Sequence, residues 1–151
     1  MSQPLILAVA LLALSALLPA LHLAQAERSE RTAAVLPLRD RLIGQILEAV
    51  PETRLTGHPG QRLPNHASFV FDNIDGNMLL MQLDLAGFAC SSGSACKSGN
   101  PEPSGVLTSI GLPRHWALGS LRVTLGVHTT PSHIDALCAV LPMIIPKVRS
   151  G

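Results

Sequence analysis

The chain has 151 residues, enough for one domain with a hydrophobic core. Apolar residues make up 47% of it, charged residues 14% and aromatic residues 3%, and the formal net charge is +1. This balance argues against a basic surface with aromatic side chains for base stacking, so no nucleic-acid partner is expected.

The N-terminal region is apolar and uncharged, since no Lys, Arg, Asp or Glu occurs in the first 26 residues. Residues 5–26 are long enough to cross a bilayer, which takes about 20 apolar residues. They end in Ala24-Gln25-Ala26, a small-x-small pattern typical of signal cleavage sites, although no basic residue precedes them. Three interpretations stay open at this point: a signal peptide, a membrane anchor and a buried helix rich in Ala and Leu.

A helical pattern covers about residues 17–50, with Pro19 and Pro37 as expected kinks or breaks. Within it, residues 38–50 are predicted to form an amphipathic helix that ends before Pro51. The predicted buried face consists of Leu38, Leu42, Ile43, Ile46 and Leu47, and the predicted exposed face of Arg39, Asp40, Gln45 and Glu48.

Two strands and a capped helix are predicted next. A short strand is expected at residues 54–56 and a stronger one within residues 65–73. Asp75 is the expected N-cap of a helix that ends before Gly87, a glycine in the usual position after a helix. In the stronger strand, one face would carry Ser68, Val70 and Asp72, and the other Ala67, Phe69 and Phe71.

The second half of the chain contains a Gly/Ser-rich segment, "FACSSGSACKSG" at residues 88–99, followed by three predicted elements. These are a short helix at 102–110 ended by Gly111, a strand at 120–126, and a last helix at 129–142 with Pro131 in its first turn. Ile134, Leu137, Cys138 and Leu141 form an apolar stripe on that helix, which places Cys138 in the core. The order of elements predicts an α+β fold without regular β-α-β alternation.

The cysteines are Cys90, Cys96 and Cys138, an odd number that favours a reducing compartment. Neither a Cys-x-x-Cys redox motif nor zinc-ligand spacing occurs, so no metal is expected. Patterns typical of a nucleophile elbow or a phosphate-binding loop are also absent from the sequence. Lys97 and the N–H groups of a Gly/Ser loop would favour a thiolate at Cys96, which is typical of a nucleophile. From the residues alone, a surface turn with a passive cysteine remains an alternative.

Several longer stretches carry a resemblance to a known family. They are "SSGSAC" (91–96), "SGNPEPSGVL" (98–107), "GSLRVTLG" (119–126), "DGNMLLMQLDLAG" (75–87), "RLPNHASFVF" (62–71), "LTGHP" (55–59) and "LRDRLIGQIL" (38–47). Together they resemble the C-terminal part of the cysteine desulfurases that depend on pyridoxal phosphate (PLP), which belong to the class V aminotransferase family. The resemblance begins near residues 20–27 and continues to about Leu141.

This resemblance implies the small C-terminal domain of the PLP-dependent transferase fold, a short and mainly antiparallel sheet covered by helices. It divides the chain into an unmatched apolar segment (1–16), a desulfurase-like domain with its connecting helix (17–145) and a tail (146–151). By the same resemblance, Cys96 is the catalytic thiol that takes sulfur from L-cysteine as a persulfide, with release of alanine. Arg122 would bind the substrate carboxylate, a role that suits the bidentate guanidinium group.

The chain departs from the family pattern at the cofactor. The family needs a lysine that binds PLP and an acidic partner for the pyridine nitrogen. Lys97 and Lys147 are the two lysines of the chain, and neither has the family's His-Lys context. Lys97 also replaces a small hydroxyl residue, and Leu118 stands where the family often has histidine. We therefore expect no cofactor-binding residue here, and a fragment or one half of a split enzyme that is inactive alone.

The resemblance also implies partners and a location. L-Cysteine would be the substrate, and a sulfur-acceptor or iron–sulfur scaffold protein would receive the sulfur for cluster assembly and thiolation. A homodimer or a partner with the cofactor domain would complete the enzyme. The expected location is the cytoplasm, with membrane anchoring or export through residues 5–26 as an alternative. A noncatalytic persulfide carrier or interaction module is the alternative function.

Overall fold

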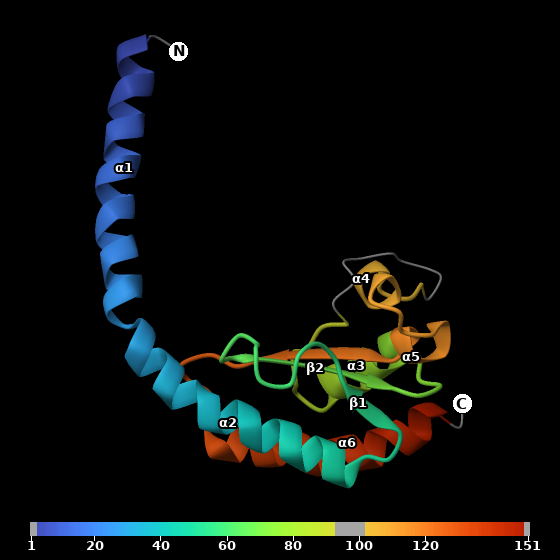
Figure 1. Cartoon of the computed structure of the whole chain (residues 1–151). Helices are drawn as coiled ribbons and strands as arrows, with labels where there is room; N and C mark the ends of the chain where they lie inside the picture. The colour runs from blue at the N-terminus through green and yellow to red at the C-terminus, as the bar shows by residue number, and fades with distance from the viewer. Residues whose placement is uncertain (1–2, 93–101, 150–151) are drawn as a thin grey trace. The chain divides into compact units, whose positions relative to one another are not determined.

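A computed structural model describes residues 3–92 and 102–149 of the chain (Figure 1). The chain divides into two compact units, Met1–Ala34 and Val35–Gly151. The first unit contains helix α1 (Gln3–Ala26) and the beginning of helix α2 (Arg28–Ala49). The second unit contains the remainder of α2, three strands and four further helices within the described residues.

Proline does not break the N-terminal helices. Pro19 lies inside α1 and Pro37 inside α2, while the two helices meet at Glu27. Of the predicted kinks or breaks at the two prolines, the breaks are therefore wrong, because an exposed helix can give up one backbone hydrogen bond to each proline. Where the structure describes side chains of α1, they are exposed, and the interpretation as a buried helix is not supported. Across residues 3–92 and 102–149, no helix is both long and apolar enough to span a membrane.

The second unit is built on an antiparallel sheet in the order β1–β2–β3, with strands at Thr53–Leu55, His66–Phe71 and Ser120–Thr124. These strands confirm the three predicted at 54–56, within 65–73 and at 120–126, with ends that differ by at most two residues. In the register of β2 and β3, Phe69 faces Leu121 and Ala67 faces Val123. Directly paired residues point to the same side of a sheet, so one face is apolar and the other carries the polar residues between them.

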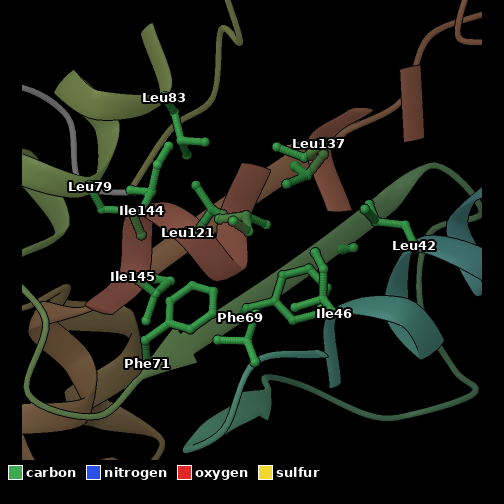
Figure 2. Packing of buried hydrophobic residues seen from close by; sticks show 14 of the residues in the cluster. Leu42, Ile46, Phe69, Phe71, Leu79, Leu83, Leu121, Leu137, Ile144 and Ile145 are labelled. Atoms are coloured by element: carbon green, nitrogen blue, oxygen red, sulfur yellow. The ribbon is translucent and has the colours of Figure 1, made fainter. Parts of the chain in front are cut away.

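The apolar face of the sheet packs against α2, α3 (Gly76–Leu85) and α6 (Pro131–Arg149) to form the core. Figure 2 shows this packing for Leu42, Ile46, Phe69, Phe71, Leu79, Leu83, Leu121, Leu137, Ile144 and Ile145. Burying each such side chain contributes about 1.5–3 kcal/mol relative to leaving it exposed. The structure thus confirms the α+β fold with an antiparallel sheet covered by helices.

The opposite face is covered only in part. Two short helices, α4 (Gly105–Ser109) and α5 (Arg114–Leu118), form a second cluster there in which Leu107, Trp116 and Ala117 surround Val70 of β2. The predicted helix at 102–110 is confirmed as α4, with Gly111 at a φ of 88° after it. Helix α5 is absent from the sequence prediction, since five residues are too few for a periodic pattern.

The ends of α3 are fixed as predicted. The Asp75 carboxylate accepts hydrogen bonds from the backbone N–H groups of Asn77 (2.8 Å) and Met78 (3.4 Å). Gly87 has a φ of 87°, and the chain turns there with backbone hydrogen bonds from Gly87 to Asp84 and from Phe88 to Leu83. This pattern is a Schellman motif, which satisfies the last carbonyls of the helix. It directs the chain from α3 back towards the sheet.

Gly119 and Gly76 allow the segment that leads into β3 to lie close to the segment that follows β2. A β-carbon on Gly119 would lie 2.2 Å from the Phe71 carbonyl oxygen, and one on Gly76 would lie 2.6 Å from the Leu118 carbonyl oxygen. The Phe71 amide donates to the Gly119 carbonyl at 2.9 Å. Only a residue without a side chain fits at these points, and both contacts determine where β3 begins.

The structure corrects two details of the helix predictions. In α2, Arg39 is 6% exposed and Leu47 is 41% exposed, the reverse of the predicted faces. Arg39 is buried because its guanidinium donates to the Leu63 carbonyl and to the Asp40 carboxylate. Helix α6 extends to Arg149, well past the predicted end at 142, through two internal prolines.

Candidate functional site

The candidate site lies on the polar face of the sheet. On β2, His66 and Ser68 alternate with the buried Ala67 and Phe69. On β3, Arg122 lies directly opposite Ser68 in the register. Residues paired in this way share a face, so the side chains of His66, Ser68 and Arg122 belong to one surface.

Arg122 is hydrogen-bonded to the stem of the segment that carries Cys96. The Arg122 amide donates to the Ser91 carbonyl (2.5 Å), and the Ser91 amide donates to the Arg122 carbonyl (3.3 Å). The Arg122 guanidinium also donates from Nη2 to the Ser91 hydroxyl (3.1 Å). One residue pair further, the buried Ser120 hydroxyl donates to the Ser92 carbonyl at 2.7 Å. Ser91 thus forms an isolated antiparallel bridge with Arg122, and Ser92 is held beside it by the Ser120 side chain.

A pocket of about 660 Å³ opens on this surface. It lies between the loop after β1, the polar face of β2 and β3, Ser92 and helix α4. Its basic side chains are those of His58, Arg62, His66 and Arg122, and no acidic residue occurs among its described lining residues. Hydroxyl groups come from Thr56, Ser68, Ser92, Ser104 and Ser120. The pocket is therefore suited to an anion.

The loop that forms one wall of the pocket is ordered by its own hydrogen bonds. Arg62 donates from Nη2 to the Thr56 carbonyl (2.8 Å) and from Nε to the His58 carbonyl (3.0 Å). The Nδ1 atom of His58 accepts from the amides of Gly60 (3.0 Å) and Gln61 (2.8 Å). Because His58 Nδ1 is an acceptor, the proton of the neutral imidazole is on Nε2. These contacts hold Arg62 at the pocket wall.

The positive charges at the pocket repel one another, and this repulsion disfavours the protonated forms of His66 and Arg62. Burial lowers the pKa of His66, and the positive charges of Arg62 and Arg122 lower it further. Burial also lowers the pKa of Arg62, with a further contribution from Arg39 that the nearby Asp40 partly offsets. An anion in the pocket would relieve this repulsion, since opposite charge favours the protonated forms.

The two described cysteines are poor nucleophiles, and Cys96 and Lys97 lie outside the described residues. Cys90 packs against the core, and burial raises the pKa of its thiol. Cys138 also packs against the core, which agrees with its predicted place in the apolar stripe. Burial and the carboxylate of Asp135 raise the pKa of Cys138 to about 11, so its thiol stays protonated at neutral pH.

The described residues do not fit PLP. The family cofactor requires a lysine, and Lys147 is exposed on α6, outside the set of described residues that line the pocket. The pyridine nitrogen requires an acidic partner, and the described lining residues include none. The same part of the chain also contains no cluster of three or more His, Cys, Asp or Glu side chains that could hold a metal ion.

Arg62 and His66 were not predicted as site residues. The alternation of β2 places His66 on the same face as Ser68, so its position could have been found from the sequence. Arg62 lies in a loop without a periodic pattern, and only the three-dimensional structure brings it to the pocket. By contrast, Arg122 was predicted from the family motif, and the structure places it at the pocket.

A model of the family described as aminotransferase class-V matches residues 3–137. The chain belongs to the class-V aminotransferase family. Within this family it is similar to cysteine desulfurase IscS of Methanosarcina thermophila, with 44% identity over 131 residues. It is also similar to cysteine desulfurase IscS 1 of Archaeoglobus fulgidus, with 41% identity over 124 residues. The alignments cover 87% and 82% of this chain.

Solved structures support the same family membership. The crystal structure of a NifS-like protein from Rickettsia africae superposes with a TM-score of 0.70 at 26% sequence identity. That superposition covers 82% of this chain and 31% of the NifS-like protein. The matches to both IscS relatives cover 32% of each relative, so the chain spans about a third of their length. The predicted resemblance to the C-terminal part of cysteine desulfurases is confirmed.

Proposed function

We propose that this chain supplies the carboxylate-binding arginine and the sulfur-accepting thiol of a cysteine desulfurase. The observation that carries the proposal is the pairing of Arg122 with Ser91. It joins the arginine directly to the stem of the segment in which Cys96 lies. The 44% identity to the IscS protein of Methanosarcina thermophila supports the assignment of the reaction.

Arg122 is proposed to bind the α-carboxylate of L-cysteine. It is exposed at a pocket that has no acidic side chain among its described lining residues, so the guanidinium charge is available to an anion. A planar guanidinium binds a carboxylate through two parallel hydrogen bonds, which fix the orientation of the substrate. Its contact with the Ser91 hydroxyl already restricts the guanidinium, so less conformational entropy is lost when the substrate binds.

Cys96 is proposed to accept the sulfur. It follows Ser92 by four residues, and an extended chain spans at most about 3.3–3.6 Å per residue, which limits the distance between their α-carbons to about 14 Å. The length of the chain between Ser92 and Cys96 is compatible with the proposed transfer of sulfur at the pocket. The net reaction forms a sulfur–sulfur bond at Cys96 and breaks the carbon–sulfur bond of L-cysteine, and a proton replaces sulfur on the released alanine. Lys97 would favour the thiolate that this reaction needs.

The cofactor must come from protein outside the described residues, because these do not fit PLP. A separate partner polypeptide with the cofactor domain of the family would provide it, and a homodimer is the other predicted assembly. The proposed sulfur acceptor is an iron–sulfur scaffold or another acceptor protein, and the proposed location is the cytoplasm. The division of the chain into residues 1–16, 17–145 and 146–151 stays a prediction.

The experiment combines the purified chain with the part of the Methanosarcina thermophila relative that precedes the matched region. PLP and L-cysteine are added, and alanine and the mass of the Cys96 peptide are measured. We expect alanine release and a mass gain of one sulfur atom at Cys96. Both should be lost in Cys96→Ser and strongly reduced in Arg122→Gln, while Cys138→Ser serves as the matched control with full activity. Alanine release that persists in Cys96→Ser would contradict the assigned role of the thiol.

A noncatalytic persulfide carrier is the second candidate, favoured by the poor fit of the described residues to PLP. It predicts that Cys96 gains sulfur only when an intact desulfurase, with its own nucleophilic cysteine, is added. A truncated relative without that cysteine would then give neither alanine nor persulfide. The same mass measurement distinguishes the two functions.

A further inference from the structure

We propose that the pocket contains a second anion-binding subsite, formed by Arg62 and His66, which takes an oxyanion in addition to the carboxylate at Arg122. The inference deepens the proposed function, since it presupposes that Arg122 binds the substrate carboxylate. Guanidinium and imidazolium groups together recognise oxyanions such as sulfate, phosphate, sulfonate and carboxylate. The oxyanion is either free in solution or the second acid group of an amino acid.

The position of His66 separates this subsite from the carboxylate site. His66 pairs with Thr124 across the sheet, and Arg122 lies two residues from Thr124 on the same face of β3. Such diagonal neighbours are about 7–8 Å apart. Both oxygens of a carboxylate held by the two arms of the Arg122 guanidinium face that group, so a second oxyanion would be the acceptor for the His66 imidazole. The pocket volume of about 660 Å³ leaves room for a further group.

Arg62 supplies a preorganised donor to the same region. Its Nε and Nη2 atoms are held by the carbonyls of His58 and Thr56, so the planar guanidinium has a fixed orientation. Its Nη1 atom is buried and has no hydrogen-bond partner in the described part of the chain. An unsatisfied buried donor is unfavourable, and a charged donor more so, and an oxyanion in the pocket beside the guanidinium would offset this cost.

The surrounding charges leave Arg62 without full compensation. Asp40 is the acidic residue that acts on Arg62, and its carboxylate accepts two hydrogen bonds from Arg39, at 2.6 and 2.9 Å. Burial and the neighbouring arginines lower the pKa values of both Arg62 and His66. The described residues therefore offset only part of the cost of keeping positive charge at this end of the pocket, and an oxyanion would offset more of it.

The test measures anion binding by the full chain in a Cys96→Ser background, so its result does not depend on sulfur transfer. Sodium sulfate is titrated against sodium chloride at equal ionic strength, and the His66 imidazole is followed by NMR. We expect saturable sulfate binding that moves the His66 titration midpoint upward, while chloride does not. A midpoint that responds equally to sulfate and chloride would overturn the proposal, and this readout needs no variant of the pocket.

Variants then locate the anion. Arg62→Gln should weaken sulfate binding at least about tenfold, as expected for loss of a hydrogen bond between charged groups. His66→Gln, which leaves the loop hydrogen bonds of Arg62 intact, should also weaken it. Arg41→Gln is the matched control: Arg41 is exposed, pairs with Asp135 and does not line the pocket. If Arg122→Gln abolishes sulfate binding and Arg62→Gln leaves it unchanged, sulfate occupies only the carboxylate site and the proposal is wrong.

A third measurement identifies the source of the oxyanion. L-Cysteate carries a sulfonate as well as the α-carboxylate, whereas L-alanine carries the carboxylate alone. If the subsite takes the acid group of an amino acid, cysteate should bind at least about tenfold tighter than alanine or sulfate, and Arg62→Gln should remove this advantage. Cysteate binding no tighter than sulfate would assign the subsite to a free oxyanion. Failure of the desulfurase reaction would leave all these binding results unaffected.

Discussion

Gly119 offers a sharp test of how the fold positions the site. It lies directly before Ser120 and three residues before Arg122, where α5 ends and β3 begins. A β-carbon at this position would lie 2.2 Å from the Phe71 carbonyl oxygen and 3.0 Å from the Ile74 β-carbon. Gly119→Ala therefore requires the backbone of β3 or β2 to move.

The expected loss of stability follows from these distances. Overpacking a well-packed region costs about 1–3 kcal/mol. The backbone hydrogen bond from Phe71 to Gly119 lengthens when the strands separate, which adds about 1 kcal/mol. We expect Gly119→Ala to lower the free energy of unfolding by about 2–4 kcal/mol. Its φ of −83° is an ordinary value, so the effect comes from crowding and not from backbone conformation.

The assay is urea unfolding followed by the fluorescence of Trp116, the single tryptophan, which is buried beside Val70. Gly44→Ala is the matched control, because a β-carbon there has no neighbour within 4 Å and the position is inside α2. It should stabilise the protein by about 0.5–1 kcal/mol. Equal stability changes in the two variants, or a loss below about 1 kcal/mol for Gly119→Ala, would refute the crowding argument.

Three further predictions concern the site and the cysteines. Ser120→Ala removes the 2.7 Å hydrogen bond to the Ser92 carbonyl and should cost about 1 kcal/mol in urea unfolding; an unchanged midpoint would show that this bond does not hold the stem. The pKa of His66 is lowered in the folded state, so the unfolded chain binds more protons as the pH falls through the ordinary histidine range. The free energy of unfolding should therefore decrease over that pH range, and the decrease should be smaller in His66→Gln. With a pKa of about 11, Cys138 should be alkylated slowly at pH 7 and about tenfold faster for each added pH unit, as peptide mass spectrometry would show; rapid reaction at pH 7 would contradict its burial.

The features predicted correctly from the sequence depend on neighbouring residues. The Asp75 cap, the turn at Gly87 and the alternation of β2 each follow from a few consecutive residues, and all three occur in the structure. Arg39 was assigned to the wrong face because its burial depends on the Leu63 carbonyl, which lies 24 residues away in the chain. Helix α5 was missed for a similar reason, since Trp116 holds it against the sheet through a tertiary contact.

The two faces of the sheet explain why the site was only partly predictable. Phe69 and Leu121 face the helices and are constrained by packing in the core. Ser68 and Arg122 occupy the alternating positions on the other face and line the pocket. A family motif predicts the role of Arg122 because the motif "GSLRVTLG" is one continuous stretch around β3. The proposed role of Arg62 depends on how the loop between β1 and β2 folds over the pocket. Local sequence patterns do not predict the position of that loop. Binding residues contributed by loops therefore need the three-dimensional structure, whereas those on strands follow from alternation and register.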